Sequence, residues 1–454
     1  MRFGMRLALV GVLGALAACS SGAGTANTGA AGAMPVVNTN AAPLQTPGAA
    51  VAQVARRPVT SGPAAPVCGP AANGFARCHS LRRSDIGFAQ GDTTPDRHFP
   101  HSTPSPSPTS TPGSGSCPNA SISGYQPCDL QSAYKLPSTT AGAGQTVAIV
   151  DAYDDPNAES DLNVYRSTFG LAPCTTANGC FRKVSQTGGT TYPRASGSWA
   201  QEISLDLDMV SAICPNCHVL LVEADSASVL NLAAAVSEAA TLKANAVSNS
   251  YGANESSSLV STYGSSYTQA AQGRAVTASS GDSGYSAGPQ FPADLVAVTA
   301  AGGTHLVTDG SARGWNESVW SGAGSGCSTV IAQPGWQSAL NLPAGCSGRI
   351  IADTAAVADP NTGVAVYDSY QASGWLVFGG TSVASPIVAS VYALAGNTSG
   401  LSDSSYPYGH DSSSTLNDVT SGSNGTCSLS YLCTGEVGYD GATGLGTPHG
   451  ASGF

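Results

Sequence analysis

The stretch Trp375 to Ala395, WLVFGGTSVASPIVASVYALA, predicts a strand that ends at a glycine pair and leads into a helix. Trp375 to Phe378 has the texture of a buried strand, and Ile387 to Ala395 has that of a helix. Pro386 suits the first turn of this helix, where no backbone N–H is needed. Ser382 then stands at a strand-to-helix turn, where the helix dipole and its own N–H favour a developing oxyanion. A serine that only caps the helix is the alternative.

Short β-branched runs recur along the chain before this stretch, and alanine-rich helical stretches such as Ser228 to Lys243 lie between several of them. We expect strands at Thr146–Val150, Val219–Ala224, Ala246–Ser250, Ala275–Ser279 and Val296–Ala300. Strands that alternate with helices imply a mostly parallel central sheet with helices on both faces, which is an α/β fold.

A predicted helix from Trp199 to Ile213 carries two acids on its apolar side. Asp206 stands where the helical spacing of the apolar residues leads us to expect another apolar one, and Glu202 lies one turn earlier. If the two carboxyls are partly buried, they cannot both ionise easily and will share a proton over a wide acidic range. That property suits general acid–base chemistry, whereas a solvated acidic face is the alternative.

The N-terminus has the features of an export signal. Arg2 and Arg6 precede an apolar run, Leu7 to Ala18, that is too short to span a bilayer. The run ends in Leu-Ala-Ala-Cys19, which resembles the bacterial lipobox, in which the cysteine is acylated and becomes the first residue of the mature protein. An ordinary signal peptide cleaved nearby is the alternative. We expect a cell-surface location, with membrane contact only through a lipid on Cys19.

The composition of residues 20–124 differs from that of the rest of the chain. Residues 20–65 are rich in Ala, Gly, Thr and Pro, and residues 101–116 are low in complexity, so neither stretch can bury a core. Between them, a small loop near residues 68–90 is closed by cysteines. We therefore assign a signal peptide to residues 1–19, a tether with a small Cys-closed segment to residues 20–124, and one large domain to residues 125–454.

The cysteines support export. Apart from Cys19 there are twelve, an even number, as expected for an exported protein with disulfides. Pairing within sequence-local couples is the simplest arrangement: Cys68/Cys78, Cys117/Cys128, Cys174/Cys180, Cys214/Cys217, Cys327/Cys346 and Cys427/Cys433. Cys214-Pro-Asn-Cys-His218 also matches a haem attachment signature, but it lies in the short link between a helix and a core strand, where a haem would displace the domain's own packing.

Charge excludes one class of partner. Residues 1–124 carry eight arginines and three aspartates, whereas residues 125–454 carry nine basic and 25 acidic side chains. Because a strongly acidic domain repels phosphate backbones, we expect no nucleic-acid partner.

The motif Gly-Thr-Ser382-x-x-Ser-Pro resembles that around the nucleophile of two related peptidase groups, the subtilisins and the sedolisins (serine-carboxyl peptidases). Asp151 follows a strand much as the subtilisin aspartate does, but the His-Gly-Thr run that subtilisins need is absent from the sequence. The sedolisin pattern fits better, because its Glu-x-x-x-Asp matches Glu202 and Asp206. Its Ser-Gly-Asp-x-Gly turn matches Ser280 to Gly284, and the resemblance implies that Asp282 donates to the oxyanion as a neutral carboxyl.

A further resemblance, near the C-terminus, implies one structural calcium ion. Hard calcium takes six or more oxygen ligands. The sedolisin pattern supplies them from the side chains of two aspartates and from three backbone oxygens, here Asp418, Asp440, Val419, Glu436 and Gly438. Glu436 stands where family members often have glycine, which a backbone ligand tolerates.

The resemblance runs from Tyr125 to Gly450 and implies a subtilisin-like fold in a monomeric enzyme that cuts polypeptides at acidic pH through Ser382, Glu202 and Asp206. The segment between Cys19 and Tyr125 does not match the large folded pro-domain of most sedolisins, which leaves open how activity is restrained. A surface protein that binds peptides on the same scaffold without cutting them is the alternative function.

Overall fold

A computed structural model of the chain describes residues 61–86, 117, 119 and 121–454, all of which fall within the compact unit Gln53–Phe454. The predicted signal peptide, Cys19 and most of the predicted tether lie outside the described residues. In the part of the chain that the structure describes, no helix has both the length and the apolarity to cross a membrane.

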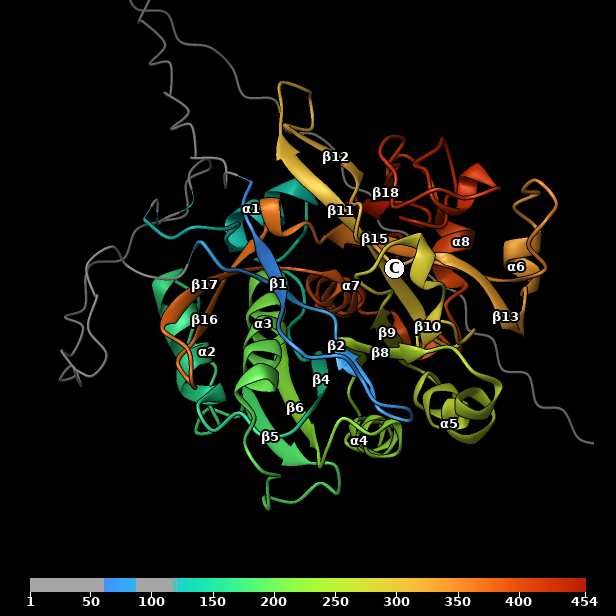
Figure 1. Cartoon of the computed structure of the whole chain (residues 1–454). Helices are drawn as coiled ribbons and strands as arrows, with labels where there is room; N and C mark the ends of the chain where they lie inside the picture. Colours follow the sequence, from blue (N-terminus) through green and yellow to red (C-terminus); the bar gives the residue numbers. More distant parts are fainter. Residues whose placement is uncertain (1–60, 87–116, 118, 120) are drawn as a thin grey trace, which may run out of the picture. The chain divides into compact units, whose positions relative to one another are not determined.

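The centre of the domain is an eight-stranded sheet with the order β12-β11-β9-β7-β4-β6-β5, in which β15 also pairs with β11 (Figure 1). All its pairs are parallel except β11 with β12. The strands are β4 (Thr146–Ala152), β5 (Phe181–Ser185), β6 (His218–Ala224), β7 (Ala246–Asn249), β9 (Ala275–Ser279), β11 (Thr299–Thr308), β12 (Trp315–Val319) and β15 (Thr354–Val357). The predicted, mostly parallel sheet is therefore confirmed.

Helices cover both faces of this sheet, as predicted. Along β4, Val147 and Ile149 belong to one core cluster, and Ala148 and Val150 belong to the other, as the two-residue period of a strand requires. The first cluster includes residues of α2, α3 and α7, and the second includes residues of α4 and α5. These helices span α2 (Ala158–Thr168), α3 (Gly197–Ile213), α4 (Val229–Thr241), α5 (Ser257–Ala270) and α7 (Thr381–Ala395).

Two predicted element boundaries need correction. The last predicted strand begins at Thr299 rather than Val296, because residues 292–298 form consecutive backbone turns. The helix after the glycine pair begins at Thr381 rather than Ile387, which places Pro386 inside it. Proline has no N–H to offer the carbonyl of Ser382. That carbonyl instead accepts a hydrogen bond from Ser250 Oγ at 3.4 Å.

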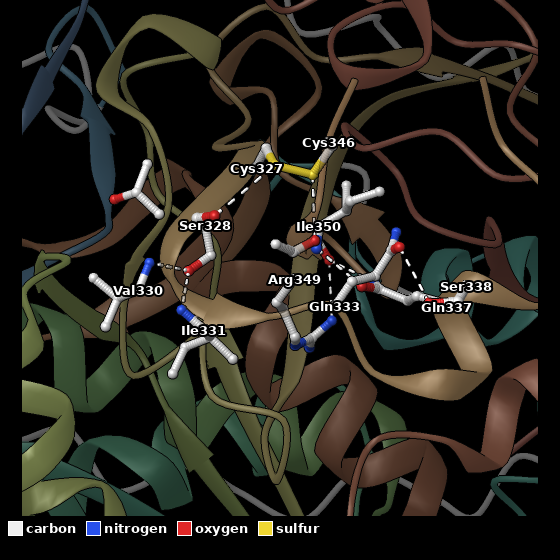
Figure 2. Close-up of a disulfide and its surroundings, with 12 residues drawn as sticks. Cys327, Ser328, Val330, Ile331, Gln333, Gln337, Ser338, Cys346, Arg349 and Ile350 are labelled. Carbon is white, nitrogen blue, oxygen red and sulfur yellow. Dashed lines mark hydrogen bonds between the residues drawn. A yellow bond between two sulfur atoms is a disulfide. The ribbon is translucent and has the colours of Figure 1, made fainter. Parts of the chain in front are cut away.

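All six predicted disulfides form. Figure 2 shows one of them, Cys327–Cys346, which closes the antiparallel pair β13 (Gly326–Ala332) and β14 (Gly348–Ile351). Beside it, the Gln337 side chain donates to the Ile350 carbonyl at 2.6 Å and accepts from the Ile350 N–H at 2.9 Å. The disulfide thus joins the two strands, and the Gln337 amide ties the connection between them to β14.

The Cys-closed segment was predicted to be part of a tether. In the structure, residues 61–86 instead contribute strands to two sheets of the domain. β3 (Leu81–Arg83) lies between β1 (Ala64–Pro66) and β17 (Gly374–Gly379) in a four-stranded sheet completed by β16 (Val364–Asp368). β2 (Arg77–Cys78) pairs with β8 (Tyr251–Asn254), whose other neighbour is β10 (Gln290–Phe291). Backbone pairing holds a segment that has little apolar sequence of its own.

Candidate active site

Helix α3 places Glu202 and Asp206 in the interior of the domain. Every residue from Trp199 to Ile213 is buried, and both acidic side chains are 0% exposed. The alternative of a solvated acidic face is therefore wrong. Helix α3 packs beside α7 (Figure 1). Glu202 lies close to Ser382 in the N-terminal turn of α7.

A third buried carboxyl, Asp151 at the end of β4, stands beside this pair. Neither of its oxygens has a hydrogen-bond partner, and burial raises the pKa of Asp151 to about 8. The pKa values of Glu202 and Asp206 are raised well above their usual range, first by burial and then by the charge of Asp151. Among the described residues, no ion pair involves any of the three. The cluster is consequently built to retain protons.

The candidate nucleophile reaches this cluster through a second serine that sequence analysis missed. Ser382 is 0% exposed, and its hydroxyl donates to the Ser250 carbonyl at 3.2 Å. Ser250 Oγ in turn donates to Asp206 Oδ1 at 2.9 Å. Ser382 also lies close enough to Glu202 to lower the pKa of that carboxyl, although Glu202 Oε1 has no hydrogen-bond partner. Nothing in the sequence around Ser250 marks it for this position.

Asp282 is held against the start of α7. Its Oδ1 accepts hydrogen bonds from the N–H of Thr381 at 2.8 Å and from the Thr381 hydroxyl at 2.9 Å. Burial raises the pKa of Asp282 to about 7, although its bonds to Thr381 act in the opposite direction. This carboxyl therefore stays neutral through the acidic range, as a hydrogen-bond donor to an oxyanion must.

Gly380 leaves the space in which an oxyanion would lie. Its φ is +99°, and a Cβ there would lie 2.3 Å from the His79 carbonyl oxygen and 2.7 Å from Asp282 Oδ2. Both the conformation and the close approach require glycine. The two oxygens thus approach the same position at the start of α7, next to the N–H of Ser382.

Residues of the Cys-closed segment fill this position. The N–H of Ser382 donates to the His79 carbonyl oxygen at 2.9 Å, and Ser80 Oγ donates to Glu202 Oε2. Sequence analysis missed both residues, because their partners are distant in the chain and no local pattern marks them. Ser382, Glu202, Asp206 and Asp282 are thus brought together around a peptide unit of the same chain.

The residues of the predicted calcium site also converge. β18 (Leu416–Asn417) pairs with β19 (Thr447–Pro448), which brings the chain around Asp418 close to that around Asp440. Asp418 Oδ2 accepts from the Gly438 N–H at 2.9 Å, and Asp440 Oδ2 accepts from the Glu436 N–H at 3.4 Å. Val419 is buried directly after Asp418.

The charge of this site fits a hard divalent cation. Asp440 is 0% exposed, and burial raises its pKa to about 7. In the ranges that the structure describes, neither Asp440 nor Asp418 forms an ion pair, so a cation would neutralise an otherwise costly buried charge. The described residues contain one other group of three possible metal ligands, Cys117, Cys128 and Asp129, but its cysteines are joined in a disulfide.

Comparison with known proteins finds similar peptidases. The chain is 30% identical to kumamolisin of Bacillus sp. (strain MN-32) in an alignment of 365 residues that covers 73% of this chain and 63% of that protein. It is 27% identical to sedolisin of Pseudomonas sp. (strain 101) in an alignment of 362 residues that covers 71% of this chain and 60% of that protein. The chain thus spans roughly three fifths of the length of these two relatives. No family model matches it.

Among solved structures, the chain is similar to a Pseudomonas sedolisin, a serine-carboxyl proteinase, in complex with two molecules of pseudo-iodotyrostatin. The TM-score is 0.61 at 27% identity, and the match covers 72% of this chain and 96% of that chain. The likeness covers nearly all of the solved peptidase chain and supports the predicted subtilisin-like fold.

The buried carboxyls predict that the domain is more stable in acid than near neutrality. Each raised pKa means that the folded state holds a proton that the unfolded state releases near pH ~4. Stability from these groups is complete below that pH, and it is lost as pH rises through the folded pKa of about 7 for Asp282 and about 8 for Asp151. Calorimetry of full-length Ser382→Ala should give a melting temperature several degrees higher at pH ~4 than at pH ~8.

In the same background, Asp151→Asn should flatten this dependence, because the amide does not titrate. Glu159→Gln, on a residue of α2 whose carboxylate accepts hydrogen bonds from Thr176, is the matched control and should leave the dependence intact. A melting temperature that rises from acid to neutral pH would contradict the protonated cluster.

Proposed function

Because the chain belongs to the sedolisin family, we propose that it is a serine-carboxyl peptidase that hydrolyses polypeptides at acidic pH, with Ser382 as its nucleophile. The observation that carries the proposal is the burial of Glu202, Asp206 and Asp151, which form no ion pair with any described residue, beside a serine at the N-terminal turn of α7. A scaffold that only binds peptides has no need of three buried carboxyls at one serine.

Catalysis begins with proton transfer within this cluster. Glu202 takes the hydroxyl proton of Ser382 as the serine attacks a substrate carbonyl. Asp206 shares the remaining proton with Glu202, and Ser250 fixes the orientation of Asp206 through its hydroxyl. Glu202 then returns the proton to the leaving amine, and water hydrolyses the acyl-enzyme by the reverse sequence.

The oxyanion is held by the N–H of Ser382 and by the protonated carboxyl of Asp282. Loss of one such donor typically lowers the rate by ~100- to 1,000-fold. A catalytically silent peptide-binding protein is the second candidate, and the segment that fills the cleft is the observation in its favour. Hydrolysis decides between the two.

Substitution of the proton-transfer residues should abolish turnover without unfolding the domain. Ser382→Ala, Glu202→Gln and Asp206→Asn should each lower kcat/KM on a denatured protein by about a thousandfold or more, with unchanged circular dichroism. His305→Ala is the matched control: His305 pairs with Asp359 at 2.8 Å and contacts none of the catalytic candidates, so activity should persist. Full activity in any of the three variants would sink the assignment, and specific loss in His305→Ala would reopen a histidine mechanism.

The pH profile should be bell-shaped with its maximum in acid. As pH rises towards neutral, Asp282 and the carboxyl cluster lose the protons that they need, and at very low pH the cluster gains a second proton and the base disappears. Asp282→Asn should lower the peak rate yet extend the alkaline limb, because an amide donor does not ionise. A wild-type optimum at about pH 8 or above would contradict the mechanism.

Sedolisins commonly hold a structural calcium ion, and we propose one here, bound by the side chains of Asp418 and Asp440 and by the backbone of Val419, Glu436 and Gly438. The ion would supply positive charge and cross-link two loops. Asp440 is already oriented for this role, because its Oδ1 accepts from the N–H groups of Ala442 and Thr443.

Chelation should lower the melting temperature, because an ion bound only to the folded state stabilises it by mass action. Added calcium should restore the melting temperature in the wild type but not in Asp440→Asn. Asp309→Asn, on a solvent-exposed turn, is the control and should respond like the wild type. An unchanged melting temperature in excess chelator, with no metal in the purified protein, would remove calcium from the proposal.

We also propose that the protein is exported and anchored at the cell surface by a lipid on Cys19, outside the described residues. The lipobox-like sequence and the six disulfides support export. The native protein should partition into detergent with an intact mass that includes acyl chains, whereas Cys19→Ser should be released as soluble protein. A mature N-terminus other than residue 19 on newly exported protein would indicate plain secretion.

A further inference from the structure

Strand β16 is the edge of its sheet, and two carboxyls take the place of a further strand along part of that edge. After a bridge to Tyr125, the next N–H on the side away from β17 is that of Tyr367, which donates to Asp208 Oδ2 at 2.9 Å. The N–H of Ser369, directly beyond the strand, donates to Asp161 Oδ2 at 2.7 Å. The edge of β16 is therefore held by acidic side chains.

These acids belong to a group of four buried carboxyls, which we call the hairpin cluster: Asp155, Asp161, Asp208 and Asp368. Asp161 lies on α2 and Asp208 on α3, both of which pack against β16 (Figure 1). Each of the four residues is at most 3% exposed. Asp208 and Asp368 each keep one oxygen without a hydrogen-bond partner among the described residues. Such an oxygen is tolerated in a buried site when its carboxyl carries a proton.

The basic side chains around the hairpin cluster bind other groups. The charged and titratable groups that face it are Asp154, Tyr165, Arg166, Lys183, Glu223, Tyr367 and Arg82. Arg166 donates to the carbonyls of Ala172 and Pro215, and Lys183 pairs with Asp154 and Glu223. Arg82 donates to the Gln201 side chain. In the ranges that the structure describes, no ion pair reaches the four carboxyls.

Protons therefore decide the charge of the hairpin cluster. Burial raises the pKa of Asp155 and Asp368 to about 7 and raises that of Asp208 well above its usual range. The charge of Asp161 adds to each shift, although the backbone N–H bonds act in the opposite direction. In acid the carboxyls are neutral and still accept those N–H bonds. As pH rises through about 7, unpaired charges accumulate in a buried site, and the stability that the protons contributed is lost.

The hairpin cluster joins the two elements that position the catalytic candidates. β16 pairs with β17 along its whole length, and β17 leads within three residues to Ser382. Helix α3 carries Glu202 and Asp206, and Asp208 follows two residues later. The bond from Tyr367 to Asp208 thus connects the strand pair before the nucleophile to the helix of the acid pair.

We propose that the hairpin cluster is a proton-dependent latch, which holds the β16–β17 hairpin on α2 and α3 in acid and releases it near neutral pH. Release hydrates the ionised carboxyls and frees the N–H groups of Tyr367 and Ser369 from their acceptors. The hairpin then no longer holds Ser382 in line with Glu202. Only this last effect, on turnover, rests on the proposed peptidase function, because the latch itself needs no catalysis.

Hydrogen exchange tests the latch without peptidase activity. Full-length Ser382→Ala is compared at pH ~5 and ~8, with each rate divided by the rate of an unstructured peptide at the same pH. Protection of residues 364–379 should fall by about tenfold or more at the higher pH, because the latch opens locally. Protection of β4 and β7 in the central sheet should persist.

Variants that cannot ionise should keep the latch closed. In the Ser382→Ala background, Asp208→Asn/Asp368→Asn retains an oxygen for each backbone N–H, so residues 364–379 should stay protected at both pH values. Asp225→Asn/Asp309→Asn, on two exposed acids, is the matched control and should open like the parent. Added chymotrypsin at pH ~8 should cut the parent within the hairpin, which contains Tyr367, Tyr370 and Trp375, about tenfold faster than it cuts Asp208→Asn/Asp368→Asn.

The link to catalysis is tested with Ser382 intact. The ratio of kcat/KM at pH ~6.5 to that at pH ~4 should be about threefold or more higher in Asp208→Asn/Asp368→Asn than in Asp225→Asn/Asp309→Asn. An equal ratio would overturn the effect of the latch on turnover.

The outcomes separate the latch from the peptidase function. If residues 364–379 are equally protected at both pH values, or lose protection equally in Asp208→Asn/Asp368→Asn, the latch is refuted while the peptidase function stands. Loss of protection in β4 and β7 at the same pH would show global unfolding and would refute it as well. If the hairpin opens as expected but the intact chain cleaves no added protein, the peptidase function fails and the latch remains.

Discussion

Three carboxyls share one buried site in which no cationic side chain of the described residues pairs with them, and the catalytic candidates are arranged around that constraint. Asp151 comes from the end of a central strand, whereas Glu202 and Asp206 come from α3, a helix that is buried from Trp199 to Ile213. Desolvation makes simultaneous ionisation of all three prohibitive, so most of their charge is removed by protons rather than by salt bridges, of which the described residues offer none to these groups. A chain with only 10% charged residues is consistent with this chemistry, because a fold with few ion pairs loses little when its carboxylates are protonated.

Ser250 connects the acid pair to the nucleophile and to the Cys-closed segment. Its hydroxyl donates to Asp206, and its carbonyl accepts from both the Ser382 hydroxyl and the His79 N–H. The residue lies between β7 and β8, so the sheet that carries the core and the strand that pairs with the bound segment meet at one amino acid. The segment in the cleft therefore contacts Ser250, the residue that also hydrogen bonds to Asp206 of the acid pair.

The sequence predicts the parts of this structure that depend on local pattern. The strands that became β4, β6, β7 and β9 are short β-branched runs between turn residues, and helical spacing alone points to Glu202 and Asp206 on one side of α3. Asp282 could be singled out only by resemblance, because an aspartate in a glycine turn is otherwise ordinary. Ser250 and His79 were missed, and Asp151 was noted only for its likeness to the subtilisin aspartate, since their roles arise from neighbours distant in the chain. The start of α7 was misplaced because proline was assumed to mark a first turn, whereas here it lies within the helix.

The disulfides, finally, have a consequence for how the chain is made. Each joins cysteines between 3 and 19 residues apart, and no described bridge links distant parts of the domain. Short loops close with little entropy loss, so under oxidising conditions each couple can pair before the sheet exists. Mispairing among twelve thiols is thereby limited by proximity alone. The disulfides can therefore form before the core assembles. The parallel sheet, which is slow to form because its strands are distant in sequence, then assembles on a chain whose disulfides are complete.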